Sequence, residues 1–320
     1  MLNRFAAWNS WLGRRMFLLV IAAIGAGFIT AIPKSALTSR LVVILFAYMT
    51  FISALDTSIK DFFRVLKKPW IAVWILILVH FVMPFVAWGI GIIFYPQDIY
   101  TRTGFLIQAA IPIAVTSLIW TSIVSGDMAL SIVAITMDTI ISPFLLPLFF
   151  SIVLGKTVQL DYISMIWELM LMVSLPSLTG MIIHDLTNNR LSKLTSSIGG
   201  FSSKIAIFLM VALNAGSIVP EIHWDLGLAR LLVIIGLLVA CGFILGFLGS
   251  LPLRQINPAT LVTMVYTIGM RNISFGVVLA MAYFPVKVAV PVTLATFFQH
   301  PIAGIVAQLF KKHGKIDSIA

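Results

Sequence analysis

Charged side chains are scarce in this chain, and cysteine is almost absent. Only 10% of the 320 residues are Asp, Glu, Lys or Arg, whereas soluble globular domains carry roughly 25%. So few charges exclude a soluble domain of this size. The single cysteine, Cys241, excludes a disulfide framework and thiolate metal sites within the chain. The sequence also lacks a phosphate-binding loop, a metal-ligand His/Glu spacing and a hydrolase-like Ser/His/Asp set, so it predicts no enzyme and no cofactor.

Apolar residues fill the chain instead. They make up 60% of it, and the mean hydropathy is +1.08. Because about 20 apolar residues cross a bilayer as a helix, the sequence predicts an all-α polytopic protein embedded in the lipid bilayer. Ten stretches are expected to span it, at about residues 16–31, 41–55, 70–94, 104–125, 128–154, 165–183, 205–219, 231–248, 258–284 and 288–310.

Basic residues outnumber acidic ones and give a net charge of +10. In a membrane protein such residues gather in cytoplasmic loops, so the excess does not indicate a nucleic-acid partner. If the N-terminus lies inside, fourteen Lys and Arg fall in the loops on its side and six in the others. The count predicts a multi-pass cell-membrane protein with both termini in the cytoplasm.

The two halves of the chain resemble each other faintly. The fourth stretch has Ile111-Pro112 in its middle, and the ninth has Gly269 to Asn272 there. The fifth carries Ser142-Pro143 and the tenth carries His300-Pro301. Five spans turn the second half upside down relative to the first, as in many secondary transporters. We therefore predict two inverted five-helix repeats, residues 1–155 and 156–320.

The fourth and ninth spans are candidates for broken helices. Pro112 removes a backbone donor, and Gly269 permits the dihedrals of an unwound segment. Polar residues that could cap a second half-helix follow each break, and such N-termini can hold an anion at mid-membrane. The predicted substrate-binding residues are Pro112, Thr116, Ser117, Asn272 and Ser274. The alternative is a plain kink at Pro112, with hydroxyls bonded to their own helix.

Asp138 and Arg271 are the ionisable residues deepest within the predicted spans. Because each charge is costly in the membrane, the two are expected to face each other or a wet cavity. His80, at similar depth, would be the proton-responsive group. Ser131 shares a helix face with Asp138. The alternatives are a static ion pair and a hydrogen-bonded packing histidine.

Three segments carry a resemblance to the bile acid:sodium symporter family. They are Lys68-Pro69-Trp70 through Pro84, PIAVTSLIWTSIVSGDMALSIVAITMDTIISP from Pro112 to Pro143, and GMRNISFGVVLA from Gly269 to Ala280. The resemblance implies a ten-helix fold with a panel domain (spans 1, 2, 6 and 7) and a core domain (spans 3–5 and 8–10). It also implies that spans 4 and 9 unwind where they cross, and that core and panel alternate access to the site.

The chain departs from the family at the sodium ligands that the resemblance implies. Ser117 and Ser131 match that pattern. Side chains of other kinds stand at the remaining positions, namely Leu118, Ile135, His80, Thr267 and Arg271. Leucine and isoleucine offer no side-chain oxygen, and an arginine repels a cation. Sodium coupling of the usual kind is therefore not expected. We assign ion coupling to His80, Ser131, Asp138, Thr267 and Arg271, with the guanidinium as a permanent positive charge and Asp138 as its counter-ion.

Three interpretations of function stay open. The favoured one is a secondary transporter of a small organic anion, either proton-coupled or uncoupled, acting as a monomer or weak homo-oligomer. The second is a membrane sensor or receptor that kept the fold and does not transport. The third is a conventional sodium symporter with rebuilt ion sites. Sodium and pH gradients across proteoliposomes distinguish them.

Overall fold

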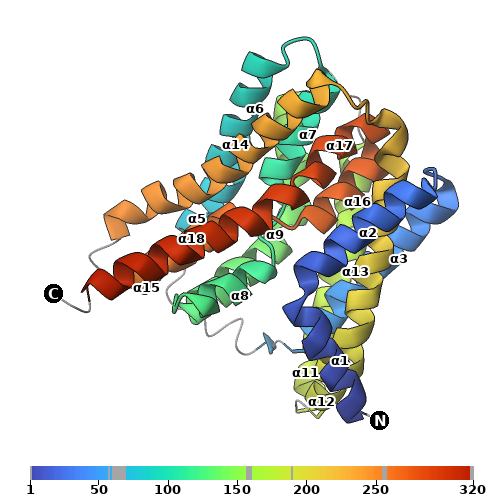
Figure 1. Cartoon of the computed structure of the whole chain (residues 1–320). Helices are drawn as coiled ribbons and strands as arrows, with labels where there is room; N and C mark the ends of the chain where they lie inside the picture. Colours follow the sequence, from blue (N-terminus) through green and yellow to red (C-terminus); the bar gives the residue numbers. More distant parts are fainter. Residues whose placement is uncertain are drawn as a thin grey trace. The chain divides into compact units, whose positions relative to one another are not determined.

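The computed structural model describes residues 2–56, 58–59, 70–155, 161–188, 190–253 and 258–317. Helices account for nearly all of these residues (Figure 1). The single strand-like contact among them is an isolated antiparallel bridge between Ile113 and Arg271. The loop at 60–69, Lys156 and Arg254, which entered the count of basic residues, lie outside the described residues, as does the Lys68-Pro69 part of one family-like segment.

The chain divides into two compact units. The first comprises residues 1–64, 143–221 and 277–286. It contains the ends of α9 (Met128–Leu154) and α16 (Ile273–Tyr283), together with α1 (Leu2–Arg14), α2 (Met16–Thr30), α3 (Ala36–Ala54), α10 (Tyr162–Leu169), η2 (Met170–Ser174), α11 (Leu175–Leu186), α12 (Ser192–Leu194), η3 (Thr195–Gly199), α13 (Gly200–Ile218) and η4 (Val219–Glu221).

The second unit comprises residues 65–142, 222–276 and 287–320. It holds the first parts of α9 and α16. Its other elements are α5 (Trp70–Ile77), η1 (Leu78–Val82), α6 (Met83–Phe94), α7 (Ile99–Ala110), α8 (Thr116–Ile123), α14 (Leu226–Ser250), η5 (Leu251–Leu253), α15 (Pro258–Gly269), nearly all of α17 (Val286–Leu294) and α18 (Thr296–Asp317).

Seven helical stretches in the described part of the chain are long and apolar enough to cross a membrane. An eighth is obtained if α1 and α2, bent by 80°, count as one span. The fourth and ninth predicted spans differ from these stretches because each is divided into two short helices. The breaks lie at residues 111–115, between α7 and α8, and at 270–272, between α15 and α16. The all-helical membrane class is thus confirmed, and both breaks lie in the segments where the sequence predicts them.

Glycines let the helices of the second unit pack closely. A Cβ on Gly246 of α14 would lie 2.7 Å from the carbonyl oxygen of Met264 on α15. Gly242 faces Gly269, with 3.3 Å between its ideal Cβ and the Cα of Gly269. A Cβ on Gly269 would in turn meet the Phe243 ring at 2.5 Å, and no described glycine has a positive φ. Gly269 is therefore needed for space and not, as its sequence context suggested, for an unusual backbone conformation.

Candidate functional site

Two unwound segments of the second unit pair with each other through their backbones. The N–H of Ala114 donates to the Met270 carbonyl over 3.0 Å, and the N–H of Asn272 donates to the Pro112 carbonyl over 2.8 Å. These bonds flank the bridge between Ile113 and Arg271. A broken helix leaves backbone groups without partners, and such groups are costly inside a membrane. The crossover satisfies several of them mutually.

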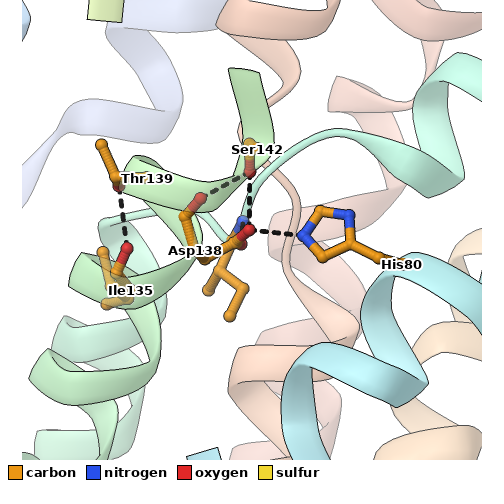
Figure 2. Close-up of polar contacts among 6 residues, drawn as sticks. His80, Ile135, Asp138, Thr139 and Ser142 are labelled. Carbon is orange, nitrogen blue, oxygen red and sulfur yellow. Dashed lines mark hydrogen bonds and ion pairs between the residues drawn. The ribbon is translucent and has the colours of Figure 1, made fainter. Parts of the chain in front are cut away.

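Asp138 holds one side of this crossover. Its side chain is fully buried on α9, and Oδ2 accepts the backbone N–H of Ile113 over 2.5 Å. Oδ1 accepts the Ser142 hydroxyl over 2.7 Å and lies 2.5 Å from Nε2 of His80. Figure 2 shows His80 and Ser142 both pointing toward this carboxylate. A carboxylate with this many donors remains stable as an anion in a buried site.

His80 reaches Asp138 from a local π-helical turn. Residues 78–82 form η1, between α5 and α6. Pro84 follows at the start of α6 and has no N–H to donate to the carbonyl of residue 80. Freed from the regular ladder, the preceding turn widens into a π-turn, a form often found at functional sites. The His80 ring is buried here, at 4% exposure.

Gln299 holds the other side of the crossover and is not among the site residues predicted from the sequence. Its Oε1 accepts the backbone N–H of Arg271 over 2.8 Å, and its Nε2 donates to the Arg271 carbonyl over 3.0 Å. Gln299 lies on α18 and is 3% exposed. An amide within an apolar helix, one residue before His300-Pro301, was the available signal. Gln108 of α7 was missed too; it is buried, and its Oε1 has no hydrogen-bond partner among the described residues.

The Arg271 side chain is 2% exposed. Its Nη1 and Nη2 have no hydrogen-bond partner in the described part of the chain. The expected direct pair with Asp138 is not formed, because that carboxylate is engaged by His80, Ile113 and Ser142. The two charges still interact electrostatically at longer range. The site therefore contains a buried guanidinium with free donors and a counter-charge near it.

The half-helix caps differ between the two breaks. Asn272 caps α16 as expected, since its Oδ1 accepts the N–H of Phe275 over 3.2 Å. Thr116 and Ser117 do not cap α8, whose N-cap is Val115 and has no side-chain cap bond. The cause is register: both residues already lie inside the first turn of α8. Ser274 is half-buried within α16.

The hydroxyls assigned to ion coupling have different surroundings. Thr267 donates to the Thr263 carbonyl of its own helix over 2.8 Å. The hydroxyls of Ser117 and Ser131 are buried, and neither has a hydrogen-bond partner among the residues that the structure describes. Thr121, one turn after Ser117, has the same free hydroxyl and was not predicted. Free buried hydroxyls remain available to water or a ligand.

The chain is similar to known membrane transporters. The model of the Sodium Bile acid symporter family matches residues 41–221. The protein YbaS of Bacillus subtilis (strain 168) is 32% identical over 269 residues, which cover 84% of this chain and 88% of that protein. The uncharacterized sodium-dependent transporter YocS of the same organism is 24% identical over 303 residues, or 94% of this chain and 91% of that protein. The probable chloroplastic sodium/metabolite cotransporter BASS2 of rice is 25% identical over 232 residues, covering 72% of this chain and 54% of that protein.

Proposed function

The chain belongs to the sodium bile acid symporter family, and from this premise we propose that it carries a small organic anion together with a proton. The protein is a multi-pass membrane transporter. The anion binds at the crossover, and the coupling ion is a proton held by the His80–Asp138 pair. Ion coupling through this pair replaces sodium coupling.

The observation that carries this proposal is the buried guanidinium of Arg271. Its two outer nitrogens have no partner among the described residues, although the side chain is almost wholly enclosed. Buried donors are normally satisfied, and a buried cation is strongly destabilised without an anion. A carboxylate accepts two parallel N–H bonds from a guanidinium. An organic anion therefore supplies what the site lacks.

Charge balance in the site explains how a proton and an anion travel together. With His80 neutral, the charges of Asp138 and Arg271 cancel. A proton on His80 adds one positive charge, and a bound monocarboxylate adds one negative charge. The empty site and the doubly loaded site are thus neutral, whereas a singly loaded site carries a net charge. On insertion scales, one charged side chain at the centre of a membrane helix costs about 2.5–3.5 kcal/mol. Crossing the membrane singly loaded is disfavoured, which is the condition for one-to-one symport.

The residues present do not fit a sodium site of the kind that the resemblance implies. A sodium ion needs several oxygen ligands. The side chains of Leu118 and Ile135 have no oxygen, and the Thr267 hydroxyl already donates to a carbonyl of its own helix. The guanidinium of Arg271 would repel a cation in the same region. The sodium dependence in the name of YocS describes that relative, and no transport step is assigned to sodium in this chain.

The two compact units support an alternating-access mechanism. The first contains most of the helices that the resemblance assigns to a panel domain, and the second most of those assigned to a core domain. The crossover, with its anion and proton groups, lies within the second unit alone. We place both termini in the cytoplasm of a cell-membrane protein, following the excess of basic residues. In the proposed inverted repeat, the break between α7 and α8 corresponds to the break between α15 and α16.

Reconstituted protein in proteoliposomes tests the proposal. Uptake of labelled small mono- and dicarboxylates is measured with an imposed sodium gradient and, separately, with an acidic exterior. We expect saturable uptake that the pH gradient drives and that sodium does not. Arg271→Gln should abolish it, whereas Arg271→Lys, which keeps the charge, should retain part of it.

Two outcomes contradict the proposal in different ways. Concentrative uptake driven by a sodium gradient, with no response to pH, restores the conventional sodium symporter. Tight binding of a carboxylate without any uptake or counterflow favours the receptor interpretation. Where uptake is driven by the pH gradient, the His80→Gln variant tests the proton group, because it should remove the pH-driven component of uptake.

A further inference from the structure

The first helix of the chain, α1, is bent sharply away from the helix that follows it. The axes of Leu2–Gly13 and Leu18–Thr30 differ by 80°. α2 contains no charged residue and lies in the first stretch that is expected to cross the bilayer. A helix at 80° to a membrane-crossing helix lies nearly parallel to the membrane surface. This geometry directs α1 along the surface and not through the hydrocarbon core.

One face of α1 is fixed to the rest of the first unit. The helix packs against η3 and α13 (Figure 1). The Phe5 ring lies 5.4 Å from the Phe201 ring of α13, centre to centre. Nδ2 of Asn9 donates to the Ser196 carbonyl of η3 over 2.6 Å, and the Lys204 amine donates to Oδ1 of Asn9. These contacts fix the rotation of α1 about its own axis, so its remaining surface faces a defined direction.

That remaining surface carries a stripe of aromatic and basic side chains. Arg4, Trp8 and Trp11 are spaced by four and three residues, so they lie on one side of the helix. Arg4 is exposed, and Trp8 and Trp11 are 61% and 52% exposed. Arg15, which follows α1, continues the stripe, since its guanidinium lies 4.5 Å from the centre of the Trp11 ring. Two exposed indole rings thus lie between two arginines.

This order of side chains suits the boundary between lipid headgroups and acyl chains. Tryptophan is enriched at that boundary because its ring is apolar and its N–H group is polar. Arginine lays its aliphatic stem on apolar surface and extends its charge toward the phosphates. A stripe that faced only hydrocarbon would not carry an arginine at each end, because charge is costly there. A stripe of this composition is typical of a helix that lies in the interface.

The charge of the segment favours anionic lipid. Residues 1–15 include three arginines, and the first acidic residue of the chain is Asp56. α1 therefore has no carboxylate of its own to neutralise its arginines. Neither Arg4 nor Arg15 forms an ion pair with another residue that the structure describes. Both guanidinium groups remain available to an anion outside the protein, and an anionic bilayer surface attracts such groups.

We propose that α1 is an interfacial helix that binds anionic phospholipid on the cytoplasmic side, where we place the N-terminus. The rings of Trp8 and Trp11 enter the boundary between headgroups and acyl chains. The guanidinium groups of Arg4 and Arg15 contact lipid phosphates. All of these groups belong to the first unit, and the inference does not rest on the proposed anion and proton transport.

Fluorescence quenching by spin-labelled lipids tests this surface in the full-length protein. In a Cys241→Ser background, Ala7→Cys carries an NBD fluorophore beside the stripe, since residue 7 is exposed and lies one turn from both Arg4 and Trp11. The labelled protein is reconstituted in phosphatidylcholine that contains a small fraction of either spin-labelled phosphatidylglycerol or spin-labelled phosphatidylcholine. The nitroxide is near the top of the acyl chain. His223→Cys, in the exposed turn before α14, carries the control label.

We expect both lipids to quench the label on α1, and phosphatidylglycerol to do so at about one tenth of the concentration. Arg4→Gln and Arg15→Gln should each reduce this preference about three- to fivefold, the share of one basic residue at an anionic surface. Arg4→Lys, which keeps the charge, should retain most of it, and a high salt concentration should remove it by screening. Arg40→Gln, at an exposed arginine of α3, is the matched control and should change nothing. The control label at residue 223 should respond to none of the α1 variants.

Three results would overturn the inference. Equal quenching by the two lipids would show that anionic lipid is not selected. A preference that survives the double variant Arg4→Gln/Arg15→Gln would show that other groups select it. A label that iodide quenches from the water and that neither lipid quenches would show that α1 stands clear of the bilayer, which leaves its stripe for a protein partner. None of these measurements needs a substrate or an ion gradient, so their outcome is separate from that of the uptake experiments.

Discussion

The electrostatic relation between Asp138 and Arg271 yields a quantitative prediction. Asp138→Asn removes one charge and keeps the side-chain shape, so its oxygen can still accept the N–H of Ile113. The change in stability is therefore chiefly the loss of a counter-charge for Arg271. Arg271→Gln removes the other charge, and the carboxylate of Asp138 keeps its partners His80, Ile113 and Ser142.

These contacts predict unequal costs for the two variants. Removing one partner of a buried ion pair in direct contact costs about 3–5 kcal/mol. Because no hydrogen bond joins these two side chains, we expect Asp138→Asn to cost less, about 2–3 kcal/mol. Arg271→Gln should cost at most about 1 kcal/mol, since the lost guanidinium nitrogens have no partners in the described part of the chain. In the Arg271→Gln background, the cost of Asp138→Asn should fall to about 1 kcal/mol, a coupling of about 1–2 kcal/mol.

Unfolding in mixed detergent micelles, followed by tryptophan fluorescence, measures all four proteins of this cycle. The matched control is Asp98→Asn, an aspartate in the same unit that pairs with Lys287, and its cost should be independent of residue 271. If Asp138→Asn costs the same in both backgrounds within about 0.5 kcal/mol, the two charges share no environment, and the charge-balance argument for symport fails.

Other predictions address the ions, the orientation and the crossover. A bound sodium ion would raise the Tm. Because we expect no sodium site, exchanging sodium for potassium at fixed ionic strength should leave the Tm unchanged. A rise in Tm that is specific to sodium would reveal a rebuilt sodium site. Reporter fusions after Lys312 and within 184–203 should report cytoplasm, and an external signal from either contradicts the orientation. Gln299→Leu should lower the unfolding free energy by about 2–3 kcal/mol, since two buried backbone groups lose their partner, and Gln299→Glu should recover part of the loss by restoring the acceptor. Burial raises the pKa of Asp98. Its hydrogen bonds, chiefly those from Thr101, lower the pKa by a larger amount, so the pKa lies below its usual value. Its stabilisation as an N-cap, about 1 kcal/mol, is thus present at neutral pH and lost as the pH falls through that lowered pKa, and Asp98→Asn should remove this part of the acid dependence.

The membrane class and the two helix breaks could be predicted from the sequence because they depend on local chemistry. Long apolar stretches have no stable soluble fold, and Pro112 cannot continue a helical ladder. The partner of Asp138 could not be predicted in the same way. Counting residues along a span gives the depth of a side chain and not the direction in which it points. Two opposite charges at equal depth suggested a pair, whereas His80 and the Ile113 backbone engage the carboxylate.

The surroundings of His80 depend on a local sequence feature. Pro84 stands four residues later, so the carbonyl of residue 80 has no ladder donor and the turn widens into η1. A π-turn changes the direction in which a side chain points from its helix. This direction can be predicted from the sequence only if the π-turn itself is predicted. Gln299 is different, because it acts on the backbone of a distant segment. Its polarity was visible in the sequence, but its partner depends on how α18 packs beside the crossover.

Asp138 and Gln299 perform the same structural task on the two sides of the crossover. Each comes from the helix pair that follows a break, and each accepts the N–H of one member of the bridge, Ile113 or Arg271. This correspondence supports the inverted-repeat relation that the sequence suggests. Their surroundings differ, since the carboxylate is joined to the imidazole of His80 and the carboxamide is not. If His80 carries the coupling proton, as we propose, the proton alters the surroundings of the Ile113 side of the crossover and not those of the Arg271 side, so we expect the response of the crossover to pH to begin at α7 and α8.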